Sequence, residues 1–169
     1  MNILNKIVAD KKVEVIQKKK LLPMSYLETS PLFERHCNSL VKKIKINDFG
    51  IIAEFKRRSP SKKNINSSLS VTKVAKEYED AGVSGMSVLT DGKYFSGSLE
   101  DLILSRSIIS LPLLRKDFVI DEYQIIEAKA NGADVILLIA AILSRNEIKN
   151  FSSLANNLGL EVLLSLIHI

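Results

Sequence analysis

Two lysines and a glutamate stand where short apolar segments of this sequence end. Segment 50–56 (GIIAEFK) carries Glu54 and Lys56, and segment 111–117 (LPLLRKD) carries Lys116. Residues two apart on a β-strand point to the same side, so Glu54 and Lys56 would face a common space. A carboxylate and two ammonium groups that converge in a partly desolvated site can act as general acids or bases. The alternative interpretation is a salt bridge at a rim, without a chemical role.

The segments next to these residues offer hydroxyl and aromatic groups. Segment 57–64 (RRSPSKKN) surrounds Ser59 with cations. Such a loop can bind phosphate or carboxylate, but the same residues are equally typical of a solvated surface loop. Segment 93–98 (KYFSGS) is either a lid that carries Phe95 or a turn before a helix capped at Ser98. Phe118 would supply one wall of an aromatic pocket or an ordinary core contact.

A regular alternation of elements must position these side chains. Amphipathic stretches over 70–82, 98–108, 121–132 and 144–159 separate five apolar runs, which span 50–56, 85–91, 111–117, 133–140 and 160–166. Glycines close three of the helices in the C-cap region, at Gly82, Gly132 and Gly159. Strand followed by helix, repeated, predicts parallel strands joined by crossovers.

Two α/β architectures have this alternation, the doubly wound open sheet and the (β/α)8 barrel. No glycine follows the first run until Gly82, so the glycine-rich turn of a dinucleotide-binding sheet is missing. Polar residues at the ends of the runs favour the barrel, whose chemistry lies at the carboxyl ends of its strands. We therefore predict an incomplete (β/α)8 barrel of about five parallel strands over residues 47–169.

Residues 1–46 are predicted to form a separate N-terminal helical extension. Apolar residues recur with helical spacing over 2–20, and a second short helix is expected over 32–44, with Pro31 at its first position. The lysines of the first helix would form a solvated face; they are Lys11, Lys12, Lys18, Lys19 and Lys20.

Composition excludes several classes of protein. The 169 residues are 46% hydrophobic and 25% charged, which is typical of a globular domain and not of a disordered chain. The longest apolar run, Val135 to Leu143, is about half of the roughly 20 residues that span a bilayer, and no secretory signal is present, so a cytoplasmic location is expected. The single cysteine, Cys37, forms no internal disulfide, and no metal site is predicted.

The net charge of +5 does not identify a partner by itself, because it is compatible with nucleic acid and fits an anionic small molecule equally well. A net charge of +5 is compatible with an anionic substrate, and basic residues are not interleaved with aromatic ones as nucleic-acid binding requires. Neither nucleic acid nor a membrane is therefore expected as a partner.

Four segments together resemble one family, indole-3-glycerol-phosphate synthase. They are IIAEFKRRSPSKKNI (51–65), SVLTDGKYFSGSLEDL (87–102), PLLRKDFVIDEYQIIEAKANGADVILLIAAIL (112–143) and LGLEVLL (158–164). The opening ILNKIVADKKVEV is similar to that family's N-terminal helix. The resemblance covers nearly the whole chain and implies a (β/α)8 barrel lyase of tryptophan biosynthesis that uses no metal or organic cofactor. Its implied reaction closes the ring of 1-(2-carboxyphenylamino)-1-deoxyribulose 5-phosphate and releases carbon dioxide and water.

The resemblance also implies a role for each matching residue. Lys116 matches the family's general acid, Glu54 an acid/base glutamate, and Lys56 a lysine that binds anionic groups and assists dehydration. The residues that match its substrate-binding positions are Ser59 in the Ser-Pro motif, Phe95 and Phe118 around the anthranilate ring, and Leu138 as an apolar wall.

The sequence departs from the family after LGLEVLL. The family has a catalytic glutamate at the position of Ser165, and a neutral hydroxyl does not replace a carboxylate base at pH 7. A complete barrel has about 250 residues, so three strands are unaccounted for and the chain is interpreted as truncated or frame-shifted. We expect such a chain to be inactive and to self-associate through its open strand edges.

Two other functions fit the same residues. A non-catalytic half-barrel would recruit a partner chain through its exposed edge, either a second copy or a missing C-terminal piece. Another phosphate-binding barrel enzyme would use Lys116 to form a Schiff base with a carbonyl substrate.

Overall fold

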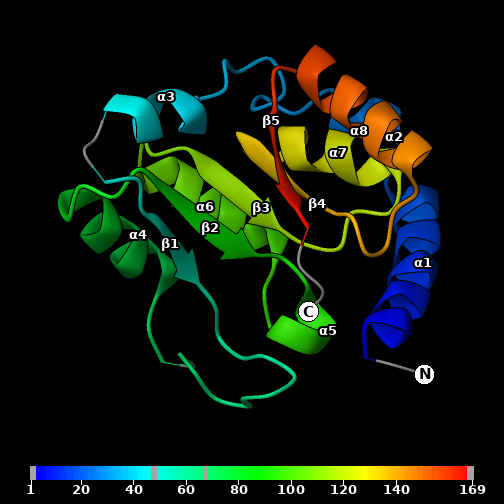
Figure 1. Cartoon of the computed structure of the whole chain (residues 1–169), viewed down its shortest axis with the longest axis horizontal. Coiled ribbons are helices and arrows are strands. Elements are labelled where there is room, and N and C mark those ends of the chain that lie inside the picture. The colour runs from blue at the N-terminus through cyan, green and yellow to red at the C-terminus, as the bar shows by residue number, and fades with distance from the viewer. Residues whose placement is uncertain (1–2, 47–48, 67, 167–169) are drawn as a thin grey trace.

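In the described part of the chain, five parallel strands form one sheet, and their order in space is their order in the sequence (Figure 1). The computed structural model describes residues 3–46, 49–66 and 68–166. The strands of the sheet are β1 (Ile52–Phe55), β2 (Gly85–Leu89), β3 (Leu113–Lys116), β4 (Val135–Ile139) and β5 (Glu161–Ser165). Each predicted apolar run contains one of these strands. Residue 47, where the predicted barrel region begins, lies outside the described residues.

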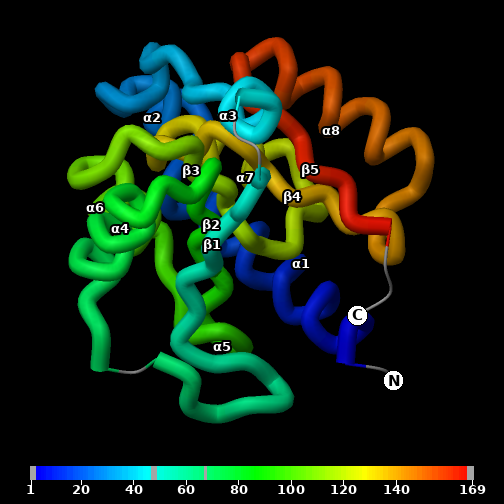
Figure 2. The backbone as a smooth tube through the Cα atoms, turned by 60° about the vertical axis from the view of Figure 1, so that its left-hand side comes forward, coloured from blue at the N-terminus to red at the C-terminus, as the bar shows by residue number. Residues whose placement is uncertain are grey.

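The sheet topology confirms the barrel architecture over the doubly wound one. A doubly wound sheet reverses its strand order at a switch point and has helices on both faces. Here the order never reverses, and the four crossover helices all pack against one face, as Figure 2 also shows. They are α4 (Val71–Asp80), α6 (Leu99–Ile108), α7 (Glu122–Ala130) and α8 (Arg145–Asn157). The described strands are therefore five of the strands of a (β/α)8 barrel.

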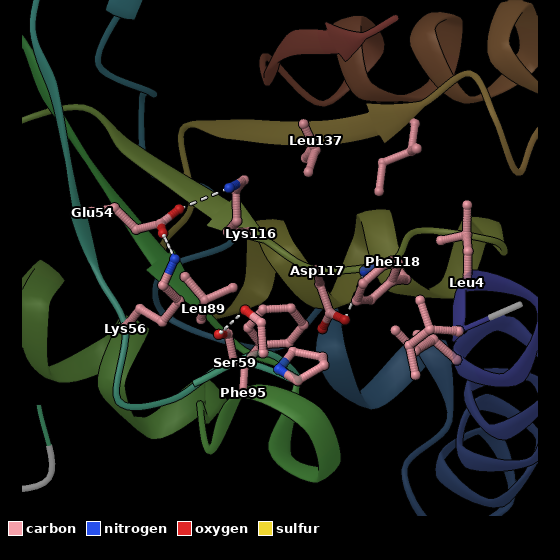
Figure 3. Close-up of a pocket in the computed structure, with 15 residues that line it drawn as sticks. Leu4, Glu54, Lys56, Ser59, Leu89, Phe95, Lys116, Asp117, Phe118 and Leu137 are labelled. Carbon is pink, nitrogen blue, oxygen red and sulfur yellow. Dashed lines mark hydrogen bonds and ion pairs between the residues drawn. The ribbon is translucent and has the colours of Figure 1, made fainter. Parts of the chain in front are cut away.

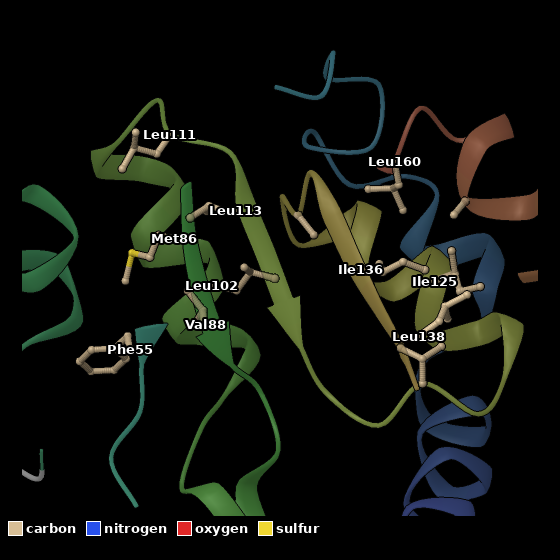
Figure 4. Close-up of a cluster of buried hydrophobic side chains, with 14 of the residues drawn as sticks. Phe55, Met86, Val88, Leu102, Leu111, Leu113, Ile125, Ile136, Leu138 and Leu160 are labelled. Atoms are coloured by element: carbon tan, nitrogen blue, oxygen red, sulfur yellow. The ribbon is translucent and has the colours of Figure 1, made fainter. Parts of the chain in front are cut away.

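Successive side chains along each strand point to opposite faces of the sheet, and the apolar ones form one layer on each face. Phe55, Val88 and Leu113 point outward and pack under α4 and α6, while Ile136 and Leu138 pack under α7 and α8 (Figure 4). The residues between them point to the opposite, concave face of the sheet. Because successive strand residues face opposite sides, one side anchors the helices and the other is left for a site.

Side-chain caps fix where the crossover helices begin. Ser98 accepts a hydrogen bond from the Asp101 N–H at the start of α6, and Ser144 forms a reciprocal capping box with Glu147 at the start of α8. Gly82, Gly132 and Gly159 follow helices with φ near +80°, as predicted from their spacing. A short helix, α5 (Gly92–Phe95), precedes α6 and is capped by Asp91.

The chain before β1 differs from the prediction in its second half. The first helix, α1, spans Ile3–Leu21, and residue 2 of the predicted helix is outside the described part. The helix predicted over 32–44 is wrong: the chain instead forms α2 (Met24–Leu27) and α3 (Leu40–Ile46), with turns and irregular structure over 31–39.

Tertiary hydrogen bonds explain why no helix forms over 31–39. Asp134, at the base of β4, accepts from the Arg35 guanidinium at 2.8 Å and from the Asn38 N–H at 2.7 Å. Glu161, at the base of β5, accepts from the Ser39 hydroxyl and from the N–H groups of Leu40 and Val41. These contacts hold the chain across the amino ends of the strands and start α3 there.

The solvated lysine face predicted for α1 is partly wrong. Lys11 is 1% exposed, and the buried face of the helix consists of Leu4, Ile7, Lys11 and Val15. Lys18 and Lys19 are partly exposed and pair with Glu127 and Asp121 of the α7 region. None of the helices in the described ranges is both long and apolar enough to cross a bilayer.

Candidate active site

The three charged residues predicted from the strand ends meet at the concave face of the sheet. Lys116 Nζ lies 2.7 Å from Glu54 Oε2, and Lys56 Nζ lies 2.7 Å from Glu54 Oε1 (Figure 3). Each side chain is about one third exposed or less. Phe55, between Glu54 and Lys56, is buried on the opposite face, as the alternation predicts. The geometry that the sequence predicts for these three groups is confirmed.

The two lysines determine the charge state of Glu54. Burial raises the pKa of the Glu54 carboxyl, but hydrogen bonds from Lys116 and Lys56 and their positive charges more than offset this effect, so the pKa lies below its usual value of 4.5. Glu54 is therefore an anion at neutral pH. The site holds the Glu54 carboxylate between two ammonium groups, and the Asp117 carboxylate, which is paired with Lys11 and Arg115, also lines the cavity. The ammonium groups of Lys56 and Lys116 can pair with an anionic ligand.

A cavity of about 420 Å³ opens beside these charges. Ser59, Phe95 and Phe118 all line it, as predicted. The rings of Phe95 and Phe118 are tilted by 38° with centroids 6.0 Å apart, which forms an apolar wall suited to an aromatic ring. Ser59 lies in a tight turn, where its hydroxyl is 3.1 Å from that of Ser61.

The placement predicted for Leu138 is wrong. Leu138 is fully buried in the outer layer with α7 and α8, and Leu137 and Ile139 line the cavity instead. A strand residue and its successor face opposite sides of the sheet, so Leu138 faces the helices when Leu137 faces the cavity. Every residue of β4 is apolar and buried, so its sequence carries no alternation that would indicate which leucine faces inward.

The wall formed by α1 was missing from the sequence-based site. Ile3, Leu4 and Ile7 line the cavity opposite the strand ends. Leu4 and Ile7 are three residues apart and so share one helix face, and that spacing is the signal that could have indicated a buried wall. In the described part of the chain, no group of three or more His, Cys, Asp or Glu side chains is placed to hold a metal ion.

Ser165 is the last residue of β5 and pairs with Ile139, which lines the cavity. Ser165 itself is not among the residues that line the cavity, and its neutral side chain adds no charge there. His168 lies outside the described residues.

Fold and site define a class of protein: a (β/α)8-barrel chain with a charged cluster and an aromatic cavity at the carboxyl ends of its strands. Residues 4–168 match the family model "Indole-3-glycerol phosphate synthase". The chain belongs to this family.

Relatives that bear the same family name support this assignment and differ in length. The chain is 42% identical over 165 residues to an indole-3-glycerol phosphate synthase of Bacteroides thetaiotaomicron and 43% identical over 169 residues to that of Neisseria meningitidis serogroup B. Each match covers 98% of this chain but 64% and 65% of the relative. A third, from Paenarthrobacter aurescens, is 52% identical over 117 residues, which cover 69% of this chain and 43% of the relative. The chain thus spans just under two thirds of the length of the first two.

Proposed function

We propose that this chain carries the charged and aromatic part of a site for indole-3-glycerol phosphate synthesis. The observation that supports the proposal best is that Glu54, Lys56 and Lys116 converge at one end of a cavity whose wall holds Phe95 and Phe118. An anionic, aromatic substrate matches both ends of that cavity. The proposed substrate is 1-(2-carboxyphenylamino)-1-deoxyribulose 5-phosphate.

In the proposed reaction Lys116 is the general acid. Its ammonium group would protonate the ribulose carbonyl oxygen while the ring carbon that bears the carboxylate attacks the carbonyl carbon. Loss of carbon dioxide restores the aromatic ring, and the new hydroxyl then leaves as water with the help of Lys56. Glu54 orients both ammonium groups and exchanges protons with them, since its carboxylate contacts both.

The remaining groups bind and orient the substrate. Phe95 and Phe118 would contact the anthranilate ring, and Leu137 would complete the apolar wall in place of Leu138. Ser59 would hydrogen-bond an anionic oxygen of the substrate.

Titration with the proposed substrate, followed through its anthranilate fluorescence, tests this assignment. We expect saturable binding that Phe118→Ala and Lys56→Met each weaken about tenfold, because one removes an aromatic wall and the other a cation. Lys63→Met, in an exposed part of the same loop as Ser59, is the matched control and should bind like the unmodified chain. Absence of saturable binding, or equal binding by all variants, would contradict the proposal.

A second candidate function is assembly with another chain through the sheet edges. In the described residues β1 and β5 each pair on one side only, and apolar side chains near them are exposed: Phe49, Ile51, Leu163, Leu164 and Leu166. Unpaired backbone groups beside exposed apolar side chains favour strand pairing between chains. Measurement of the mass in solution separates an assembling chain from a monomer.

A further inference from the structure

Lys11 of α1 is a buried cation among three carboxylates. Its side chain is 1% exposed, and its Nζ lies 2.8 Å from Glu14 Oε2, 2.9 Å from Asp91 Oδ2 and 3.1 Å from Asp117 Oδ1. Asp91 and Asp117 are themselves 2% and 1% exposed. Burial lowers the pKa of the Lys11 ammonium, but the surrounding carboxylates outweigh it and hold the pKa well above the usual value. Lys11 therefore stays charged.

Two of these carboxylates belong to segments that carry site residues. Asp91 caps α5, where it accepts from the Tyr94 N–H at 2.7 Å, next to Phe95. Asp117 stands between Lys116 and Phe118, and its Oδ1 accepts from the Phe118 N–H at 2.8 Å. One ammonium group thus joins α1 to the ends of both β2 and β3.

The remaining contacts of Asp117 hold it firmly. Its Oδ2 accepts from the Thr90 hydroxyl at 2.6 Å and from Arg115 Nη2 at 3.1 Å. Both donors are buried. Lys11 therefore binds a carboxylate that the sheet already fixes, and it is the helix that is positioned by the contact.

Lys11 shares its helix face with the residues that line the cavity. Positions 4, 7 and 11 lie on one face of α1, and Leu4 and Ile7 form part of the cavity wall. This part of α1 is also held by the packing of Leu4 and Ile7 and by ion pairs and hydrogen bonds from Asp10 to Lys93 and Tyr94, which are more exposed. Breaking a buried ion pair costs more than breaking an exposed one, so the Lys11 contacts contribute more to the placement of this face than those of Asp10.

We propose that Lys11 is a positioning residue of the site: it locks α1 onto Asp91 and Asp117, which places Leu4 and Ile7 over the cavity and orders the segments that carry Phe95 and Phe118. Lys11 acts through these groups and does not line the cavity that the substrate would occupy. The consequence for substrate rests on the proposed function, whereas the placement of the helix does not.

Two measurements on the full chain test this role. Amide hydrogen exchange of residues 4–12, Tyr94 and Phe118 reports on the placement of the helix and of the two capped segments. Fluorescence titration with anthranilate (2-aminobenzoate) reports on the aromatic cavity. We expect Lys11→Met to speed these exchange rates and to weaken anthranilate binding, each at least tenfold, and Lys11→Arg to restore most of both because it keeps the cation. Lys12→Met, which removes the adjacent exposed lysine, should change neither.

The outcomes separate this inference from the proposed function. Normal anthranilate binding by Lys11→Met, or no rescue by Lys11→Arg, would overturn the positioning role. If the unmodified chain does not bind anthranilate, the proposed function fails. The hydrogen-exchange rates of Lys11→Met then test the positioning role alone: faster exchange than in the unmodified chain supports it, and unchanged exchange refutes it. If Lys11→Met does not fold, the double variant Lys11→Met/Asp91→Asn, which loses one charge of each sign, is measured against the same criteria.

Discussion

At the scale of single residues, the charge on Glu54 depends on its two lysines. Folding lowers the pKa of this carboxyl, so the stabilisation it provides is present above the unfolded-state value of 4.5 and is lost as the pH falls through the lowered folded-state value. We expect a ¹³C NMR titration of the Glu54 carboxyl carbon to give a midpoint below 4.5. Lys116→Met should raise that midpoint, because it removes one of the two cations, and Lys63→Met should not. A midpoint at or above 4.5 in the unmodified chain would contradict this electrostatic interpretation.

Ser165 provides the second prediction at this scale. General acid–base groups contribute about 10²–10⁴-fold to a rate, so a chain with serine where the family has a catalytic glutamate should convert the proposed substrate slowly or not at all. We expect Ser165→Glu to raise product formation at least tenfold above the unmodified chain. Ser165→Gln has the same size without the charge and should not.

Product fluorescence follows the reaction, with the Bacteroides thetaiotaomicron relative as the reference. Turnover by the unmodified chain comparable to that of the relative would show that a carboxylate at position 165 is dispensable.

The charged site residues could be predicted from the sequence, and the apolar ones only in part. Glu54, Lys56 and Lys116 stand at the carboxyl ends of strands, where the active site of a (β/α)8 barrel lies. Their position therefore indicates a catalytic site, and so does their chemical type as acids and bases. Leu137 could not be told from Leu138 in a strand that is buried on both faces. Lys11 belongs to a lysine-rich helix, and its burial depends on carboxylates about 80 and 106 residues further along the chain.

At the scale of elements, the turn that follows α5 requires a glycine at position 97. A Cβ at Gly97 would overlap the backbone carbonyl of Leu89, at the end of β2, and backbone cannot move aside as a flexible side chain can. We expect Gly97→Ala to lower the free energy of unfolding by about 1–3 kcal/mol, the usual cost of overpacking. Gly92→Ala, at the start of the same helix, has its nearest neighbour at 3.7 Å and is the matched control.

Urea denaturation measures both glycine variants. Because the turn at Gly97 follows Phe95, Gly97→Ala should also weaken anthranilate binding, whereas Gly92→Ala should not. Equal stability of the two variants would mean that the turn adjusts without cost.

The elements of the barrel and the first helix were predictable from the sequence, whereas the path of the segment 31–39 was not. Strands and crossover helices follow local patterns of periodicity and caps, which the sequence displays directly. The segment 31–39 instead adopts its path because Asp134 and Glu161, which are distant in sequence, bind its polar groups. Local helix signals at Pro31 therefore misled, since tertiary hydrogen bonds outweigh weak propensities.

At the scale of the whole molecule, the consecutive strand order shows that the sheet has no switch point between its described strands. The outer face is covered by its crossover helices, and the concave face is covered in part by α1 (Figure 2). What the sequence could not provide is the contact between α1 and the strand ends, because it joins segments across most of the chain.

The two sheet edges lead to the last prediction. Within the ranges that the structure describes, β1 and β5 each pair with one neighbouring strand only, and Leu164 on β5 is 41% exposed. We expect sedimentation equilibrium to give a mass that rises above 18.8 kDa with concentration.

A charge on an edge strand opposes pairing with another strand, so Leu164→Lys should shift the association to higher concentration. Ile16→Lys replaces a residue that is 56% exposed on α1, which is not a strand of the sheet, and should leave the association unchanged. A constant mass of 18.8 kDa for the unmodified chain would exclude edge pairing, and equal effects of both lysines would assign the association to general hydrophobicity.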